Sequence, residues 1–168
     1  MGTIKIYAPS FKDRGFFKRK IMADVNLRKL TEADRESFFE MSRDFYSCGA
    51  AHAPIPEENR INFWKEALAG ELVNGYVIEY KGETASYALV AYYCSQEYGG
   101  KVAFFDELYI KPDMRGHGIG KKVFEFVENS GAVACRLEVE RTNARALKLY
   151  SALGYKEFDY LQMSKKLK

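Results

Sequence analysis

The residues best suited to bind a ligand lie in the glycine-rich segment 115–120 (RGHGIG), which follows a strand-like stretch and opens a helix-like one. Glycines let the backbone approach a ligand closely and turn several N–H groups toward it. The first turn of a helix adds unpaired donors and a positive dipole end. The pattern therefore predicts an anion cradle that suits a pyrophosphate, with added positive charge from Arg115, Lys121 and Lys122.

Two other phosphate-binding motifs fail at this segment. A Walker A loop needs glycine five residues before the Gly-Lys pair and Ser or Thr after it, but Arg115 and Lys122 stand there. The dinucleotide motif GxGxxG needs a glycine at position 121 or 123, and Lys121 and Val123 occupy these positions. On this motif alone, the alternative that stays open is a glycine-rich turn without a ligand.

A second motif follows in residues 143–155 (NARALKLYSALGY). In order and spacing, the two segments resemble the GNAT acetyltransferase superfamily. Arg115, Gly118 and Gly120 fill its motif A, [Gln/Arg]-x-x-Gly-x-[Gly/Ala], and the later segment is similar to N-x-x-A-x-x-x-Y-x-x-x-G-[FY]. The strand and helix order along Val25–Leu167 agrees with this resemblance, whereas the first 24 residues fall outside it.

The resemblance implies that acetyl-CoA is the acetyl donor, with pantetheine lying between two strands that splay apart. It also implies that the backbone of 108–110 pairs with pantetheine, that 116–121 hold the pyrophosphate, and that the later motif's asparagine lies near the pantetheine arm. The residues expected to bind the cofactor are Leu108, Tyr109, Ile110, Arg115, Gly116, His117, Gly118, Ile119, Gly120, Lys121 and Asn143.

The resemblance further implies an amine acceptor, either a small molecule or a peptide, that attacks the thioester directly in a ternary complex. An alkylammonium has a pKa near ~10.4 and must lose a proton first, which a carboxylate can accept. Asp106 and Glu107 stand beside the cofactor loop. Neighbouring residues of a regular strand face opposite sides, so one is expected at the acceptor and the other in a structural role. Polyamine acetyltransferases of this superfamily carry a comparable acidic pair.

The departing CoA thiolate calls for a general acid, and the resemblance places Tyr150 near the sulfur. A strand N–H, from Leu108, is expected to stabilise the tetrahedral oxyanion. A core tyrosine is the alternative role of Tyr150, and His52 and His117 are the alternative bases. His52 lies in the loop expected to wall the acceptor pocket.

The spacing of apolar residues predicts the elements that must position these groups. Alternating strands and helices favour an α/β fold, a mixed central sheet flanked by helices. The expected strands are Val25–Leu30, Tyr76–Tyr80, Thr84–Tyr93, Val102–Ile110 and Ala132–Glu140, followed by a hairpin of Tyr155–Phe158 and Tyr160–Ser164. The expected helices begin at an N-cap, Thr31, and run to about Tyr46, then span Glu57–Ala69, Gly118–Asn129 and Asn143–Leu153, the last closed by Gly154.

The length of 168 residues fits one domain. Residues 1–20 hold six basic residues against one acidic residue, a net of +5, so the rest of the +3 chain carries −2. We expect a basic N-terminal extension over 1–21 and an acetyltransferase domain over 22–168. No other nucleic-acid feature accompanies the extension, which argues against nucleic acid as a partner.

Other classes of protein are disfavoured by the sequence. Cys48, Cys94 and Cys135 are far apart and form no CxxC pair, which argues against a disulfide framework or a metal site. No apolar run reaches the ~18 residues that span a bilayer, so a cytoplasmic protein without membrane contact is expected. The resemblance suggests a homodimer, and a non-catalytic acetyl-CoA sensor of the same fold is the alternative function. No motif identifies the acceptor.

Overall fold

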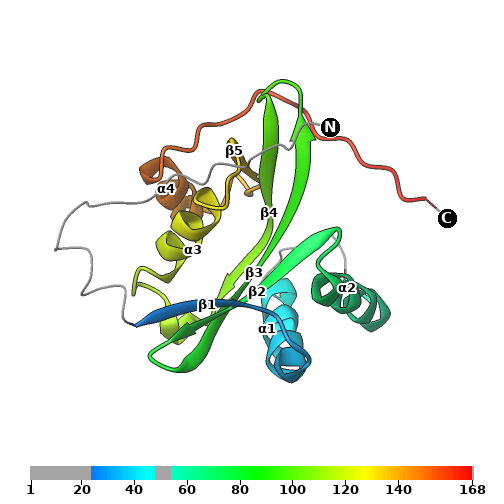
Figure 1. The fold of residues 1–168 in the computed structure, drawn as a ribbon, viewed down its shortest axis with the longest axis vertical. Helices are drawn as coiled ribbons and strands as arrows, with labels where there is room; N and C mark the ends of the chain where they lie inside the picture. Colours follow the sequence, from blue (N-terminus) through cyan, green and yellow to red (C-terminus); the bar gives the residue numbers. More distant parts are fainter. Residues whose placement is uncertain (1–23, 48–53, 168) are drawn as a thin grey trace, which may run out of the picture.

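The computed structural model describes residues 24–47 and 54–167, which form a twisted sheet with helices on both faces (Figure 1). The five strands lie in the order β1-β2-β3-β4-β5, and all neighbours are antiparallel except β4 and β5, which are parallel. This arrangement is the mixed, helix-flanked sheet that the sequence predicts. The expected extension over 1–21, Cys48 and His52 lie outside the described residues.

From β1 to α4, the strands and helices follow one another in the order that the sequence predicts. The strands are β1 (Val25–Lys29), β2 (Val73–Tyr80), β3 (Glu83–Ser95), β4 (Gly100–Ile110) and β5 (Ala134–Leu137). The helices are α1 (Arg35–Ser47), α2 (Glu57–Ala69), α3 (Ile119–Glu128) and α4 (Ala144–Ala152), with single 3-10 turns at Glu32–Asp34 and Pro112–Met114.

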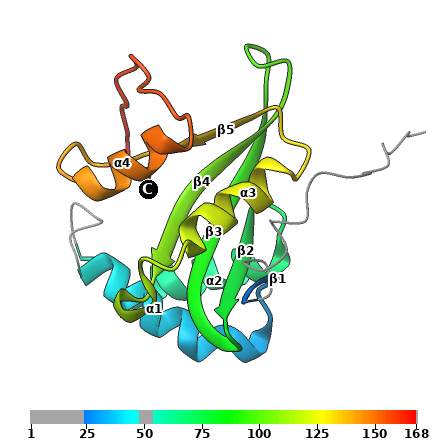
Figure 2. The same ribbon diagram turned by 90° about the vertical axis from the view of Figure 1, so that its left-hand side faces the viewer.

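Two apolar clusters sandwich the sheet, because successive side chains of a strand face opposite sides. On one face, α1 and α2 pack over β2 and β3, with the Phe38 ring 4.9 Å from Tyr87 and 5.1 Å from Trp64. On the other face, α3 and α4 cover the sheet, and the Phe124 ring lies 4.3 Å from Phe105. Figure 2 shows α3 crossing the sheet on the face that turns away from α1 and α2.

β2 and β3 are joined at the segment Lys81-Gly82-Glu83, whose short length between two strand-like stretches predicts a hairpin. Lys81 and Gly82 have positive φ, 53° and 85°, and Tyr80 pairs with Glu83 across the turn. Two residues with positive φ give a type I′ turn, whose twist matches that of the flanking strands.

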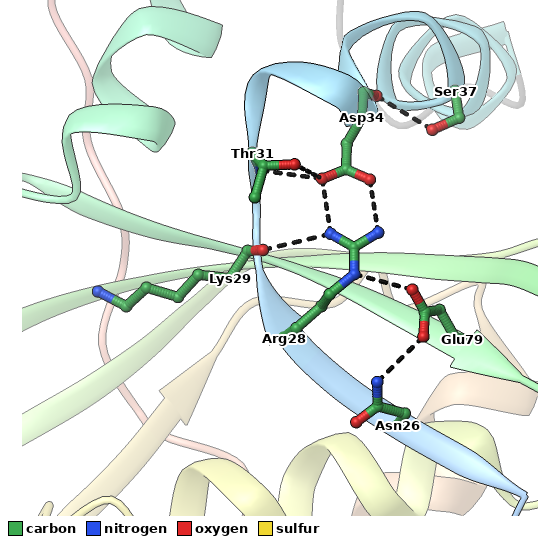
Figure 3. Close-up of polar contacts among 7 residues, drawn as sticks. All are labelled: Asn26, Arg28, Lys29, Thr31, Asp34, Ser37 and Glu79. Carbon is green, nitrogen blue, oxygen red and sulfur yellow. Dashed lines mark hydrogen bonds and ion pairs between the residues drawn. The ribbon is translucent and has the colours of Figure 1, made fainter. Parts of the chain in front are cut away.

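An ion-pair cluster fixes β1 to β2 and to the start of α1 (Figure 3). The Arg28 guanidinium donates two hydrogen bonds of 2.7 Å to Asp34 and one of 2.8 Å to Glu79. Asp34 also accepts hydrogen bonds from the backbone N–H and hydroxyl of Thr31. These contacts hold the pKa of Asp34 down at about 2, chiefly through the Arg28 hydrogen bonds and against the opposing effect of burial. Thr31 therefore precedes the helical segment as predicted, with a 3-10 turn before α1.

Two strand predictions are wrong. The strand expected over Ala132–Glu140 is reduced to β5, because only Ala134–Leu137 pair with β4. The C-terminal hairpin is absent from the described residues, and 155–167 carry no regular secondary structure. Leu161 and Met163 are 88% and 90% exposed. Alternating apolar residues form a strand only where a sheet edge receives them, and this segment pairs with none.

Within the described ranges, no helix is long and apolar enough to cross a bilayer.

Candidate active site

An irregularity in β4 brings both acidic residues to the same cavity. In the ladder with β3, Glu107 is opposite Leu89 and Phe105 is opposite Val90, so Asp106 is an extra residue without a register partner. Such a bulge interrupts the alternation of a strand and re-aims its side chains. The expectation that a regular strand would separate the two carboxylates is therefore wrong, since both line one cavity.

The same part of β4 is open on its other edge. The parallel pairing with β5 covers only Val102–Phe105, whereas β4 continues to Ile110. From Glu107 onward the described pairing of β4 is with β3 alone. Figure 2 shows β5 diverging from β4 at this point. β4 therefore has an edge without a described strand partner over the residues where the sequence predicts pairing with the pantetheine arm.

The glycine-rich segment forms an open turn before α3. Gly116 and Gly118 have φ values of 90° and 77°, and a Cβ added to either would meet no atom within 4 Å. Positive φ strongly favours glycine, and the free space above both residues fits an anion against the N-terminus of α3. Gly120 differs, because its added Cβ would lie 3.5 Å from the side chains of Ile110 and Leu149. This distance is an ordinary van der Waals contact, so an alanine would also fit where α3 packs on β4 and α4.

The charged and aromatic side chains of this segment take separate positions. Arg115 donates from Nε to the Ile110 carbonyl at 2.9 Å, which ties the loop to the end of β4. The His117 ring stacks on Tyr80 at 5.2 Å. Lys121 is exposed and lies 4.0 Å from Glu125. Arg115 and Lys121 therefore place positive charge beside the open turn where the sequence predicts a pyrophosphate cradle.

A cavity of about 280 Å³ lies between α1, α2 and the bulge of β4. Its apolar wall includes Phe38 and Phe63, and its polar lining includes Tyr46, Asn59 and Arg60 besides the two carboxylates. The dimensions suit part of a small molecule or a single side chain. This cavity borders the acidic end of β4, where the sequence predicts the acceptor.

Glu107 is the buried acid of this cavity, with 8% of its surface exposed. The Tyr46 hydroxyl donates a hydrogen bond to one carboxylate oxygen, and the Tyr87 hydroxyl donates to the other at 2.6 Å. Burial raises the pKa of Glu107 and the Asp106 charge adds to this, whereas the two phenols and the charge of Arg60 oppose it. Burial and the Glu107 charge raise the pKa of both phenols, which therefore stay protonated as donors.

Asp106 is placed differently, at the solvent rim of the cavity. The surrounding protein still removes enough water from its carboxyl to raise the pKa, and the charge of Glu138 adds to the effect. Glu138 follows β5 directly, so this charge comes from the strand next to β4.

The structure places Tyr150 on α4, half-buried against the opposite face of the sheet. Its ring lies 5.5 Å from Phe124 and 6.1 Å from Tyr155. Burial raises the pKa of Tyr150, so its hydroxyl carries a proton at neutral pH. Glu107 and Tyr150 therefore lie on opposite faces of the sheet.

Asn143 caps α4, because its side-chain oxygen accepts a hydrogen bond of 3.1 Å from the Ala146 N–H. Its amide nitrogen keeps its donor capacity for a ligand. Asn143 therefore has a structural role as the N-cap of α4, besides the contact with pantetheine that the sequence predicts.

Sequence reasoning did not identify Tyr46, Tyr87 or Arg60 as site residues. Tyr46 is 61 residues from Glu107 and Tyr87 is 20 residues away. The spacing of apolar residues places Tyr46 at the end of a helix and Tyr87 in a strand. It does not indicate that both tyrosines bind Glu107.

Comparison with known proteins matches residues 27–155 to a family described as Acetyltransferase (GNAT) family. The chain is 29% identical over 144 residues to thialysine N-epsilon-acetyltransferase from Bos taurus, covering 79% of this chain and 85% of that protein. It is 27% identical over 148 residues to spermidine N(1)-acetyltransferase from Thermoplasma acidophilum, covering 80% of this chain and 90% of that protein.

Among solved structures, the chain resembles a possible acetyltransferase from Clostridium difficile 630, with a TM-score of 0.72 and 18% identity over 86% of this chain and 98% of that one. It also resembles the aminoglycoside N-acetyltransferase AAC(6')-Iy bound to a bisubstrate analogue, with a TM-score of 0.69 and 17% identity over 86% and 99%. These likenesses confirm the predicted fold class.

Proposed function

We propose that this chain, which belongs to the acetyltransferase (GNAT) family, transfers the acetyl group of acetyl-CoA to a primary amine of a small molecule or peptide. N-Acetyltransferase activity follows from the family and from its named relatives. The observation that carries the rest is the buried Glu107 carboxylate, held by two phenols on the wall of a cavity beside the open edge of β4.

The donor binds along the gap between β4 and β5. Backbone groups of Leu108–Ile110 pair with the pantetheine arm, and the N–H groups of Gly116–Lys121 at the start of α3 hold the pyrophosphate. The open space at Gly116 and Gly118 supports this path, as do the charges of Arg115 and Lys121. Asn143 contributes its amide N–H groups to the pantetheine arm.

The acceptor enters the cavity between α1, α2 and β4 as an ammonium ion, attracted by Asp106 at the rim. Glu107 takes a proton from this ammonium group, directly or through a water molecule. The raised pKa of Glu107 makes its carboxylate a stronger base than that of a free glutamate. The neutral amine then attacks the thioester carbon in a ternary complex. The amine nitrogen forms the new C–N bond, and the carbonyl oxygen becomes the oxyanion.

The oxyanion receives a hydrogen bond from the backbone N–H of Leu108. As the C–S bond breaks, Tyr150 gives a proton to the departing CoA sulfur, and the second proton of the attacking nitrogen passes through water to the Tyr150 phenolate, which leaves a neutral amide. Its protonated hydroxyl and its position on α4 support this role.

The acceptors to test come from the relatives: thialysine, spermidine and an aminoglycoside. Release of free CoA thiol, measured with each amine, tests the proposal. Turnover with at least one amine is expected, and Glu107→Gln should abolish most of it while binding of acetyl-CoA by calorimetry persists. An acetyl-CoA sensor would instead bind the donor and release no CoA with any amine.

A further inference from the structure

Two hydrogen bonds between a tyrosine and a carboxylate join the last turn of α1 to β4, and they run in opposite directions. The Tyr46 hydroxyl of α1 donates to Glu107 of β4. The Tyr109 hydroxyl of β4 donates to the Asp44 carboxylate of α1. Glu107 and Tyr109 are two positions apart on the strand, so their side chains lie on the same face of the sheet. The end of α1 is therefore fixed to β4 at two points, and one of them is the proposed base.

The strand side of these contacts is packed, whereas the helix side reaches the surface. Tyr109 is 5% exposed, and its ring stacks on Tyr87 of β3 at 5.9 Å. Asp44 is exposed on the last turn of α1. Phe45 lies between Asp44 and Tyr46 in the chain, and its ring is 6.4 Å from that of Tyr109 and 5.0 Å from that of Tyr46. A change in these contacts therefore moves the end of α1 rather than β4.

Asp44 affects the hydrogen bond from Tyr46 because both residues belong to the same helical turn. Without the Asp44 carboxylate, this turn keeps only one of the two hydrogen bonds to β4 and gains freedom to move. The remaining bond, from Tyr46 to Glu107, is directional and weakens steeply when its angle changes. Asp44 does not line the cavity, so it reaches the reaction through this bond.

We propose that Asp44 is a positioning residue, which holds the last turn of α1 through Tyr109 so that the Tyr46 hydroxyl stays on Glu107. This inference rests on the proposed function, in which Glu107 is the base. It adds a residue outside the acceptor cavity to those that control the basicity of that carboxylate.

The direction of a pKa change separates positioning from a direct effect of charge. The groups that act on the pKa of Glu107 come from every element around it and include Tyr46 of α1, Tyr87 of β3, Asp106 of β4 and Arg60 of α2. The Tyr46 hydrogen bond lowers this pKa, so its loss raises it. Removing the negative charge of Asp44 would by itself lower the pKa of Glu107. An upward shift therefore indicates positioning.

The pH dependence of kcat/KM tests this role. Asp44→Ala and Tyr109→Phe should each move the acidic limb to higher pH, as Tyr46→Phe does and no further. Asp44→Asn keeps an oxygen that can accept the Tyr109 hydrogen bond, so it should shift the limb less than Asp44→Ala. In the double variant Asp44→Ala/Tyr46→Phe, the limb should lie where Tyr46→Phe alone places it, because the donor is already gone.

Arg43→Gln is the matched control on the neighbouring position of α1. Arg43 pairs with Glu57 at 2.6 Å, so it joins the helix to α2 and not to β4, and its loss should leave the limb in place. Urea unfolding at each pH establishes that the variants compared are folded. The inference is overturned by an unmoved limb in both Asp44→Ala and Tyr109→Phe, by a shift to lower pH, or by an equal shift in Arg43→Gln. Full additivity in the double variant would overturn it as well.

A titration without turnover separates this inference from the proposed function. Carbon-13 NMR of protein labelled at the glutamate carboxyl carbons follows the ionisation of Glu107, and Glu107→Gln assigns its signal. If no amine is acetylated, the proposed function fails, but this titration still decides the role of Asp44. A higher pKa of Glu107 in Asp44→Ala than in the wild type, with no such difference between the two in a Tyr46→Phe background, would support positioning. Equal pKa values in Asp44→Ala and the wild type would overturn it.

Discussion

The Tyr87 hydroxyl of β3 donates a 2.6 Å hydrogen bond to the Glu107 carboxylate of β4, inside the cluster that α1 covers. Tyr46 of α1 donates to the other carboxylate oxygen. Burial makes the charge of Glu107 costly, and the two donors recover part of that cost. The result is a fixed carboxylate whose pKa lies above that of a free glutamate, in a cavity beside the proposed thioester path.

Replacing Glu107 tests its role as the base. Glu107→Gln should lower kcat by about 10²–10⁴-fold, the usual contribution of general base catalysis. In the wild type, kcat/KM should fall as the pH drops through the raised pKa of Glu107, because the protonated acid cannot accept a proton. That acidic limb should vanish in the variant. Asp106→Asn is the comparison, and a larger loss there would assign the base to Asp106.

Removing either phenol should move the acidic limb. The hydrogen bonds from Tyr46 and Tyr87 lower the pKa of Glu107, so Tyr46→Phe and Tyr87→Phe should each shift the acidic limb to higher pH. The pH dependence of kcat/KM measures the shift. A limb that stays in place in both folded variants would show that Glu107 does not control it.

Gly118→Val should weaken acetyl-CoA binding strongly, since a side chain would occupy the open space before α3. The residue has a φ of 77°, so backbone strain of about 1–2 kcal/mol is also expected. Gly99→Val is the matched control, with a φ of 72° and equally open surroundings in the turn between β3 and β4, at the opposite end of β4 from the glycine-rich turn. It should lose similar stability but keep calorimetric affinity for acetyl-CoA. Equal affinity in both variants would contradict a pyrophosphate site at this turn.

Tyr150→Phe should lower kcat by about 10²-fold with little change in acetyl-CoA affinity, because it removes the proposed acid but keeps the ring. Tyr155→Phe is the control, since its ring also lies 5.5 Å from Phe124. Rapid-quench measurement of the rate of acetyl transfer compares the two variants, and only Tyr150→Phe should be slow. Full activity of Tyr150→Phe with chemistry rate-limiting would remove Tyr150 from the mechanism.

The Arg28–Asp34 pair predicts a pH dependence of stability. Asp34 has a pKa of about 2 in the fold, against 3.8 for an ordinary aspartate. The ionised Asp34 contributes fully to the free energy of unfolding at pH values above its pKa in the unfolded chain. This contribution is lost as the pH falls through its pKa in the folded protein. Asp34→Asn should cost about 1–2 kcal/mol near pH 7 and less at pH 3. Urea unfolding at several pH values measures this difference, with Glu79→Gln as a more exposed control. A cost that does not change between these pH values would contradict the assignment.

Features that depend on near neighbours in the chain could be predicted from the sequence. The segment Glu57–Ala69 is helical over the predicted range, and the hairpin expected at Lys81-Gly82-Glu83 forms there. Gly154 has a φ of 91° after α4, as a helix-closing glycine should. Sterics and hydrogen bonds within a few residues decide each of these structures. The glycine motif likewise determines the open turn before α3.

Tertiary structure alone decided how the two acidic residues, Asp106 and Glu107, are placed. The bulge at Asp106 depends on the register of β4 against β3, which strand periodicity cannot reveal. The donors to Glu107 come from distant segments, and so does the buried guanidinium of Arg60. Formation of a strand over 155–164 likewise required a sheet edge and not only an alternating pattern. The sequence determined which groups could react, whereas long-range packing determined which of them meet, lose water and acquire shifted pKa values.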